Sequence, residues 1–273
     1  MRTERSEGLM LKLEGIGKIF AKGSSNEKRA LDQVNLSLQE GEFVTVIGGN
    51  GAGKSTLFNC ISGVYEVEEG RISLDSVDIT YDPEYKRSKY IGRVFQDPLK
   101  GTAYDMTIEQ NLAIAFAKGQ RISLRPGATQ KELRLLRERL EVLDLGLENR
   151  MKHKVGLLSG GQRQALTLLM ATLVKPKILL LDEHTAALDP AIAKKVMMLT
   201  RQIVSEENLC TLMITHNMKA SLEFGTRTIM MHEGRIILDL QGEERDRMTV
   251  DQLIEQFEKK SGTELDNDRM LLG

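Results

Sequence analysis

Long apolar runs are missing from this chain of 273 residues. The longest, Ala165–Val174, is roughly half of the 20 or so residues that a membrane-spanning helix requires. The opening MRTERSEGLM is charged and lacks the apolar segment of a signal peptide. We therefore expect that the chain does not cross a bilayer by itself, and that any role at a membrane requires another chain.

Abundant cysteine and unbalanced charge are also missing. The 2 cysteines, Cys60 and Cys210, lie in apolar stretches, so we expect core residues in a reducing compartment rather than a disulfide. The 38 basic residues are balanced by 39 acidic ones, which gives a formal net charge of −1. Binding of bulk nucleic acid depends on a basic surface, so we expect no nucleic-acid partner.

A glycine-rich segment, GGNGAGKST, stands between an apolar run, Glu42–Ile47, and a predicted helix, Lys54–Ser62. Strand, loop and helix in this order are the context in which Gly-x4-Gly-Lys-Ser binds phosphate. Backbone N–H groups stabilise the phosphate oxygens, and glycine lets the backbone approach them closely. We expect Lys54 to neutralise the β- and γ-phosphates and the Ser55 hydroxyl to bind Mg²⁺. The predicted nucleotide-binding loop comprises Gly48, Gly49, Asn50, Gly51, Ala52, Gly53, Lys54, Ser55 and Thr56.

An acidic pair follows a second apolar run, Ile178–Leu181. Buried strands of open α/β sheets end at the edge where ligands bind. Asp182 is therefore predicted to hold Mg²⁺, directly or through water. Glu183, one residue further, is predicted to polarise the water that attacks the nucleotide.

Apolar periodicity predicts an α/β fold with one large helical insertion. The predicted strands are Leu11–Phe20, Leu31–Leu38, Glu42–Ile47, Arg71–Thr80, Tyr90–Phe95, Lys177–Asp182 and Leu209–Thr215. Residues 97–172 contain helical patterns, including an amphipathic helix over Thr129–Leu145 that Gly146 ends. The insertion separates a core of residues 1–96 and 173–260, and we expect residues 261–273 to form a loose tail.

Three local signals refine this interpretation. Arg227–Leu240 predicts a hairpin that turns at His232-Glu233-Gly234, and Thr249 with Gln252 predicts a capping box for a last amphipathic helix. Asp189-Pro190 predicts a helix start with aspartate at the N-cap and proline at the first position. The basic segment Lys118–Lys131, which contains Arg121 and Arg125, is predicted to be a solvated loop, with contact to anionic lipid headgroups as the alternative.

Several short motifs resemble those of the ATP-binding subunit of ATP-binding cassette (ABC) transporters over roughly Leu11–Leu240. Leu158-Ser159-Gly160-Gly161-Gln162 matches the ABC signature, and Ser159 can cap a helix that begins at Gly160. Val94-Phe95-Gln96 is similar to the Q-loop, whose glutamine reaches Mg²⁺ and the attacking water. Ala187-Leu188-Asp189 is similar to the D-loop at the dimer interface. Thr215-His216 matches the H-loop, whose histidine contacts the γ-phosphate.

The resemblance implies a RecA-like P-loop core with a mixed sheet, an antiparallel β subdomain and an inserted helical subdomain. It implies ATP and Mg²⁺ as cofactors and a head-to-tail dimer, in which Ser159, Gly160, Gly161 and Gln162 bind the nucleotide on a second copy. The family places an adenine-stacking aromatic residue near Phe20, although a strand-core phenylalanine explains this residue equally well. Gly49, His184 and Ala186 depart from the common family pattern, and His184 is positioned to tune the pKa of Glu183.

The chain has a single motif set, unlike tandem ABC proteins, and it resembles the ATPase component of a bacterial importer, which implies a place at the cytoplasmic face of the cell membrane. Its implied partners are two integral membrane permease subunits and an extracellular substrate-binding protein. The stretch GRVFQDPLKGTAYDMTIEQNLA is similar to an importer group assigned to uptake of tryptophan or other amino acids. Two alternatives share every catalytic residue: a soluble ABC ATPase that drives a cytosolic assembly scaffold, and an export ATPase.

Overall fold

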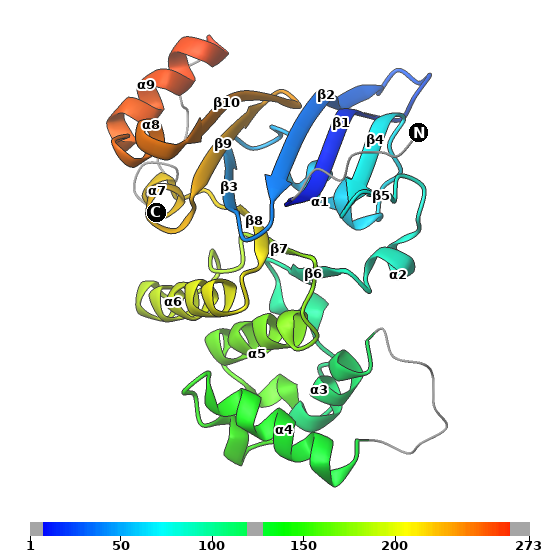
Figure 1. Ribbon diagram of the computed structural model, residues 1–273, viewed down its shortest axis with the longest axis vertical. Coiled ribbons are helices and arrows are strands. Elements are labelled where there is room, and N and C mark those ends of the chain that lie inside the picture. Colours follow the sequence, from blue (N-terminus) through cyan, green and yellow to red (C-terminus); the bar gives the residue numbers. More distant parts are fainter. Residues whose placement is uncertain (1–7, 119–127, 263–273) are drawn as a thin grey trace.

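The computed structural model describes residues 8–118 and 128–262. Figure 1 shows two sheets in the upper part of the molecule and a group of helices, α3, α4 and α5, below them. The described chain thus has the predicted mixture of a central sheet, a second antiparallel sheet and a helical insertion. Among these residues, no helix combines the length and apolar character needed to cross a bilayer.

The central sheet has six strands in the order β10-β9-β3-β8-β7-β6. Their bounds are Phe43–Gly48 (β3), Ile91–Val94 (β6), Ile178–Asp182 (β7), Cys210–Ile214 (β8), Arg227–His232 (β9) and Arg235–Gln241 (β10). All neighbours are parallel except β9 and β10, which form the hairpin predicted from the sequence. Side chains on both faces of β3 and β8 are buried, which explains their continuous apolar runs.

The second sheet is antiparallel and has the order β2-β1-β4-β5. Its strands are Leu9–Phe20 (β1), Lys28–Gln39 (β2), Glu69–Leu74 (β4) and Val77–Asp78 (β5). The prediction of one strand over Arg71–Thr80 was wrong, because the chain reverses at Asp75-Ser76. Both residues have positive φ, 50° and 63°, and Leu74 pairs with Val77 across this two-residue turn.

Helix α1 (Lys54–Ser62) has the predicted bounds and packs between the two sheets. Its ends are set by Gly53 and Gly63, which both adopt left-handed conformations. Leu57, Phe58 and Ile61 join residues from both sheets in one buried cluster. The start of α1 is therefore fixed at the carboxyl end of β3, where the phosphate-binding loop was predicted.

The opposite face of the central sheet is covered by other helices, and the insertion shares its core. On this face lie α5 (Gly160–Thr172), α6 (Pro190–Glu206), α7 (Met218–Phe224) and α9 (Val250–Ser261), and the insertion adds α3 (Ile108–Phe116) and α4 (Gln130–Glu141). Leu136 of α4 and Leu179 of β7 belong to the same buried cluster. Two shorter helices, α2 (Glu84–Arg87) and α8 (Gly242–Asp246), complete the described secondary structure together with short 3₁₀ turns.

Two features of the insertion differ from the prediction, namely the end of α4 and the surroundings of Lys118. Helix α4 ends at Glu141 rather than Leu145, although Leu143 remains buried and Gly146 takes a left-handed conformation. Lys118, assigned to a solvated loop, donates from its ammonium to the Ile91 carbonyl at 3.0 Å, and burial lowers its pKa. Arg121 and Arg125 lie outside the described residues, as does the tail after Gly262. The capping box of Thr249 with Gln252 is confirmed.

Candidate nucleotide-binding and catalytic site

The glycine-rich segment forms a loop between β3 and α1. Gly48, Gly51 and Gly53 have φ values of 148°, 78° and 101°, which residues other than glycine rarely adopt. Gly53 is the N-cap of α1 and supplies no side-chain cap, so the first N–H groups of the helix stay available to an anion. The Lys54 ammonium is buried and lies over the loop, donating to the carbonyls of Gly48 at 2.7 Å and Gly49 at 3.0 Å.

The back of this loop packs against the turn between β9 and β10. The Gly234 N–H donates to the Ala52 carbonyl at 3.0 Å, and the Gly234 carbonyl accepts from the Asp32 N–H at 3.0 Å. A Cβ atom on Gly53 would lie 2.7 Å from the Ala30 carbonyl oxygen and 3.3 Å from the Gly234 Cα. The two glycines therefore allow three backbone segments to meet directly behind the phosphate loop.

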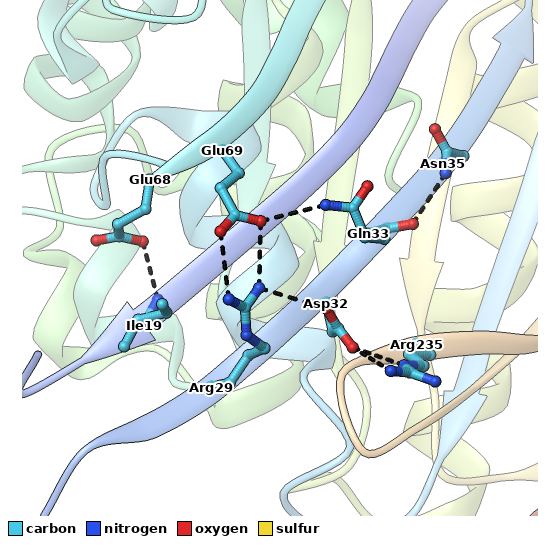
Figure 2. Close-up of polar contacts among 8 residues, drawn as sticks. All are labelled: Ile19, Arg29, Asp32, Gln33, Asn35, Glu68, Glu69 and Arg235. Atoms are coloured by element: carbon cyan, nitrogen blue, oxygen red, sulfur yellow. Dashed lines mark hydrogen bonds and ion pairs between the residues drawn. The ribbon is translucent and has the colours of Figure 1, made fainter.

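A polar network braces the same turn against the antiparallel sheet, as Figure 2 shows. Arg235, at the start of β10, donates from Nε to the Asp32 carboxylate at 2.7 Å. Arg29 contacts Asp32 at 3.3 Å and binds both carboxylate oxygens of Glu69 at 3.2 Å. Isolated surface ion pairs contribute little, but this network joins three strands around one turn.

Opposite charges meet at the carboxyl end of β7. The carboxylates of Asp182 and Glu183 raise the pKa of Lys54, but burial has the larger effect and lowers it. Burial also raises the pKa of Asp182, against the opposing effects of Arg93 and Lys54. Arg93 Nη2 lies 3.3 Å from Asp182 Oδ2. This ion pair joins residues of different strands, and no local pattern in the sequence predicts it.

Glu183 is held in an unusual backbone conformation with φ of 45°. Its N–H donates to the Ile214 carbonyl at 3.1 Å, and its carboxylate Oε1 lies 2.5 Å from His216 Nε2. Non-glycine residues adopt this conformation rarely, and such strain clusters at functional sites. The structure thus brings together the two residues predicted as base and phosphate contact, and it shows a direct pairing that sequence reasoning missed.

Glu183 and His216 face an open groove with a volume of about 1840 Å³. Gln96 and Asn50 line the same groove, so the predicted Q-loop glutamine and the tip of the phosphate loop share it with Glu183. Ser55 is solvent-exposed at the start of α1. Hydroxyl, carboxylate and amide oxygens from Ser55, Asp182 and Gln96 are the hard donors that Mg²⁺ accepts beside phosphate oxygens. The donor set therefore fits the predicted ion.

His184 lines the same groove, but its imidazole is bonded to α6, and the expected tuning of Glu183 stays a prediction. Its Nε2 lies 3.1 Å from the hydroxyl of Thr200 in α6, which itself donates to the Val196 carbonyl at 2.9 Å. The imidazole is 2% exposed, and burial lowers its pKa to about 4. Since the Thr200 proton is engaged, the imidazole is the donor, and it fastens the segment after β7 to α6.

The signature segment begins α5 through the predicted N-cap. Ser159 and Gln162 form a capping box, with each side chain accepting from the other's backbone N–H. A Cβ on Gly161 would lie 2.2 Å from Ile192 Cγ2, so this glycine also lets α5 approach α6. The predicted start of α6 is confirmed, with Asp189 at the N-cap and Pro190 in the first turn, although the Asp189 side chain makes no capping hydrogen bond.

Phe20 lies half-buried at the end of β1. Its ring packs edge-on against Tyr65, with centroids 5.3 Å apart and an interplanar angle of 83°. The Lys18 ammonium lies 5.5 Å from the Phe20 centroid. The ring is therefore packed within the chain but is not enclosed in the core, and a role in adenine stacking stays a prediction.

Comparison with known proteins supports the resemblance to ABC ATPases. A model of the family described as ABC transporter matches residues 31–186. A tyrosine transport ATP-binding protein of Clostridioides difficile is 44% identical, over 91% of this chain and 99% of that protein. A phosphonates import ATP-binding protein, PhnC, of Lactococcus lactis subsp. cremoris is 32% identical, over 89% and 98% of the two chains.

Solved structures share the fold as well. The ATP-binding cassette MJ0796, as a dimer in a post-hydrolysis state bound to ADP and Pi, is 29% identical with a TM-score of 0.73, over 88% of this chain and 100% of that chain. The ADP conformation of MJ1267, a cassette of an ABC transporter, is 27% identical with a TM-score of 0.74, over 91% and 98% of the chains. The chain therefore belongs to the ABC transporter family, as an ATPase subunit of the importer type.

Proposed function

We propose that the chain hydrolyses ATP with Mg²⁺ at the groove of Glu183 and His216, and that hydrolysis drives import of a small solute. The contact of 2.5 Å between Glu183 Oε1 and His216 Nε2 carries this proposal. A carboxylate held next to an imidazole at the carboxyl end of a buried strand can accept a proton from water while the histidine keeps it oriented. Glu183 is thus the proposed base.

The phosphate groups are proposed to bind at the loop of Gly48–Thr56. Its backbone N–H groups and the Lys54 ammonium would stabilise negative charge, and His216 would contact the γ-phosphate. Mg²⁺ would be held by Ser55, Asp182 and Gln96, and when bound it neutralises charge that develops on the phosphate oxygens. Phe20 would stack on the adenine, at the end of β1.

The active unit is proposed to be a head-to-tail dimer. Ser159, Gly160, Gly161 and Gln162 lie at the N-terminus of α5, where backbone N–H groups favour an anion. Figure 1 shows α5 in the lower part of the molecule, whereas α1 lies between the two upper sheets. We propose that the signature residues close over the nucleotide of a second copy and that Asp189, which makes no side-chain cap bond, contributes to this interface.

The proposed unit is one ABC ATPase domain over residues 1–260, with residues 97–172 as its helical subdomain. Its proposed partners are two permease subunits at the cytoplasmic face of the membrane, with an extracellular substrate-binding protein. An amino acid is the proposed solute, since a relative of 44% identity is named a tyrosine transport ATP-binding protein. Capture of a polytopic permease at near-equal stoichiometry from detergent-solubilised membranes would support this arrangement, and purely soluble partners would refute it.

The catalytic assignment is tested by ATP turnover of Glu183→Gln. We expect a loss of at least about 10²-fold in kcat with ATP binding retained, because only the proton acceptor is removed. Glu223→Gln removes the same charge from α7 on the rim of the same groove and should turn over ATP at the wild-type rate. Native turnover by Glu183→Gln would show that another group is the base.

A further inference from the structure

Arg93 occupies a position in β6 from which its side chain crosses to the end of β7. The two strands are parallel, and Arg93 pairs with Leu180, two residues before Asp182. Since side chains alternate along a strand, Arg93 and Asp182 project from the same face of the sheet. Nη2 of Arg93 lies 3.3 Å from Oδ2 of Asp182, and the two side chains are only 12% and 15% exposed.

The same guanidinium contacts two other parts of the site. Nη1 of Arg93 donates to the hydroxyl of Ser62, the last residue of α1, at 3.1 Å. The guanidinium carbon lies 4.6 Å from the ring centroid of Phe95, which directly precedes Gln96. Arg93 therefore connects the helix that carries Lys54, the strand that leads to Gln96 and the carboxylate of Asp182.

The positive charge of Arg93 disfavours binding of a second cation at Asp182. Burial raises the pKa of Asp182, and the Arg93 guanidinium has the largest effect among the groups that lower it. An ion pair at this separation with little solvent is worth several times the thermal energy at an effective dielectric constant of about 20. A divalent ion on Asp182 would have to share that carboxylate with Arg93, and the positive charge of the guanidinium would repel the ion.

We propose that Arg93 is a positioning residue that holds the Asp182 carboxylate when no divalent ion is bound and competes with that ion for it. The inference rests on the proposed Mg²⁺ role of Asp182. Arg93 thereby weakens binding of the ion and makes it responsive to the position of β6. Movement of this strand, which leads into Gln96, would change the affinity of the site for its ion.

The test is a titration of Mn²⁺ into the full-length protein with a limiting amount of ADP, followed by the electron paramagnetic resonance signal of free Mn²⁺. Arg93→Met removes the charge at similar length, and we expect the apparent Kd to fall by about five- to tenfold. Arg93→Gln is likewise neutral but keeps a donor toward Ser62, and it should act in the same direction. Arg93→Lys retains the charge and should stay within about twofold of the wild type.

Arg227→Met is the matched control. Arg227 is also 12% exposed and bonded to carboxylates, Asp239 and Glu42, but it lies on β9 outside the proposed site. Its replacement should lower stability and leave Mn²⁺ affinity unchanged. If Arg93→Met folds poorly, Arg93→Gln and the stabilisation of either variant by added Mn²⁺ in thermal unfolding give the same comparison.

Asp182→Asn separates failure of the inference from failure of the proposed site. It should abolish the tight Mn²⁺ binding, and Arg93→Met should have no further effect in that background. Wild-type Mn²⁺ affinity in Asp182→Asn would refute the metal role itself. If Asp182→Asn loses binding but Arg93→Met leaves affinity unchanged or weakens it, only the competition by Arg93 is refuted.

Discussion

The β9–β10 turn, which packs behind the phosphate loop, allows a test of how the fold supports the site. Gly234 and Gly23 both have φ of +78°, so alanine meets the same backbone strain at either position. They differ in their surroundings. A Cβ on Gly234 would lie 2.8 Å from the Ala30 carbonyl oxygen and 3.1 Å from Leu31 Cα, whereas a Cβ on Gly23 has no neighbour within 4 Å among the described residues.

The two substitutions therefore separate strain from packing. Left-handed backbone in a residue with a Cβ costs roughly 1–2 kcal/mol, and we expect this loss alone for Gly23→Ala. Gly234→Ala also forces backbone atoms apart, which adds about 1–3 kcal/mol in a well-packed interior. The free energy of unfolding, from urea denaturation, should fall by about 1–3 kcal/mol more for Gly234→Ala than for Gly23→Ala.

Nucleotide binding should report the same difference. The Gly234 N–H supports the Ala52 carbonyl within the phosphate loop, so displacing the turn moves the groups that would contact phosphate. We expect ATP to bind Gly234→Ala at least about fivefold more weakly and Gly23→Ala within about twofold of the wild type, a difference of roughly 1 kcal/mol. Equal losses of stability together with unchanged ATP affinity would refute the argument that this turn supports the loop.

Two further predictions concern buried titratable groups. The pKa of His184 is lowered to about 4 by burial, against about 6.5 when unfolded, so the unfolded state binds more protons between these values. The free energy of unfolding should fall by about 3 kcal/mol in total as the pH drops from 6.5 to 4. Urea denaturation at several pH values should show a weaker dependence of this free energy on pH in His184→Asn. An unchanged dependence would contradict burial of the neutral imidazole. Cys60 and Cys210, whose pKa values burial raises to about 12, should resist a thiol reagent at pH near 8 in the folded protein and both react in urea. Labelling of either thiol in the native state would show that its helix or strand opens.

Local signals in the sequence were enough for much of the fold. The bounds of α1 follow from Gly53 and Gly63, and the β9–β10 turn follows from Glu233-Gly234 between apolar strands. The turn at Asp75-Ser76 was missed because positive φ at both positions is a conformation usually signalled by glycine or asparagine. Local sequence predicts a turn only where it contains residue types that favour the backbone conformation of that turn.

Contacts between distant segments were beyond such reasoning. Arg93 and Asp182 are 89 positions apart, and an arginine in a short strand is ordinarily taken as a solvated residue. The motifs indicated that Glu183 and His216 belong to one site, but their direct contact depends on the register of β7 against β8, where Asp182 lies beside Ile214. The sequence thus indicates which side chains share a site, and the sheet decides which of them touch.

Each charged side chain proposed to engage ATP or its metal ion already has a partner within the chain. Lys54 contacts the carbonyls of Gly48 and Gly49, Asp182 contacts Arg93, and Glu183 contacts His216. Binding of the nucleotide must therefore exchange these partners, and only the difference between the two sets of contacts contributes to affinity. Arg93 lies on β6, which leads to Gln96, and His216 lies two residues after β8 in the groove that α7 also lines. A change of partners on nucleotide binding therefore involves β6 and the segment after β8, and these two strands flank β7 in the sheet.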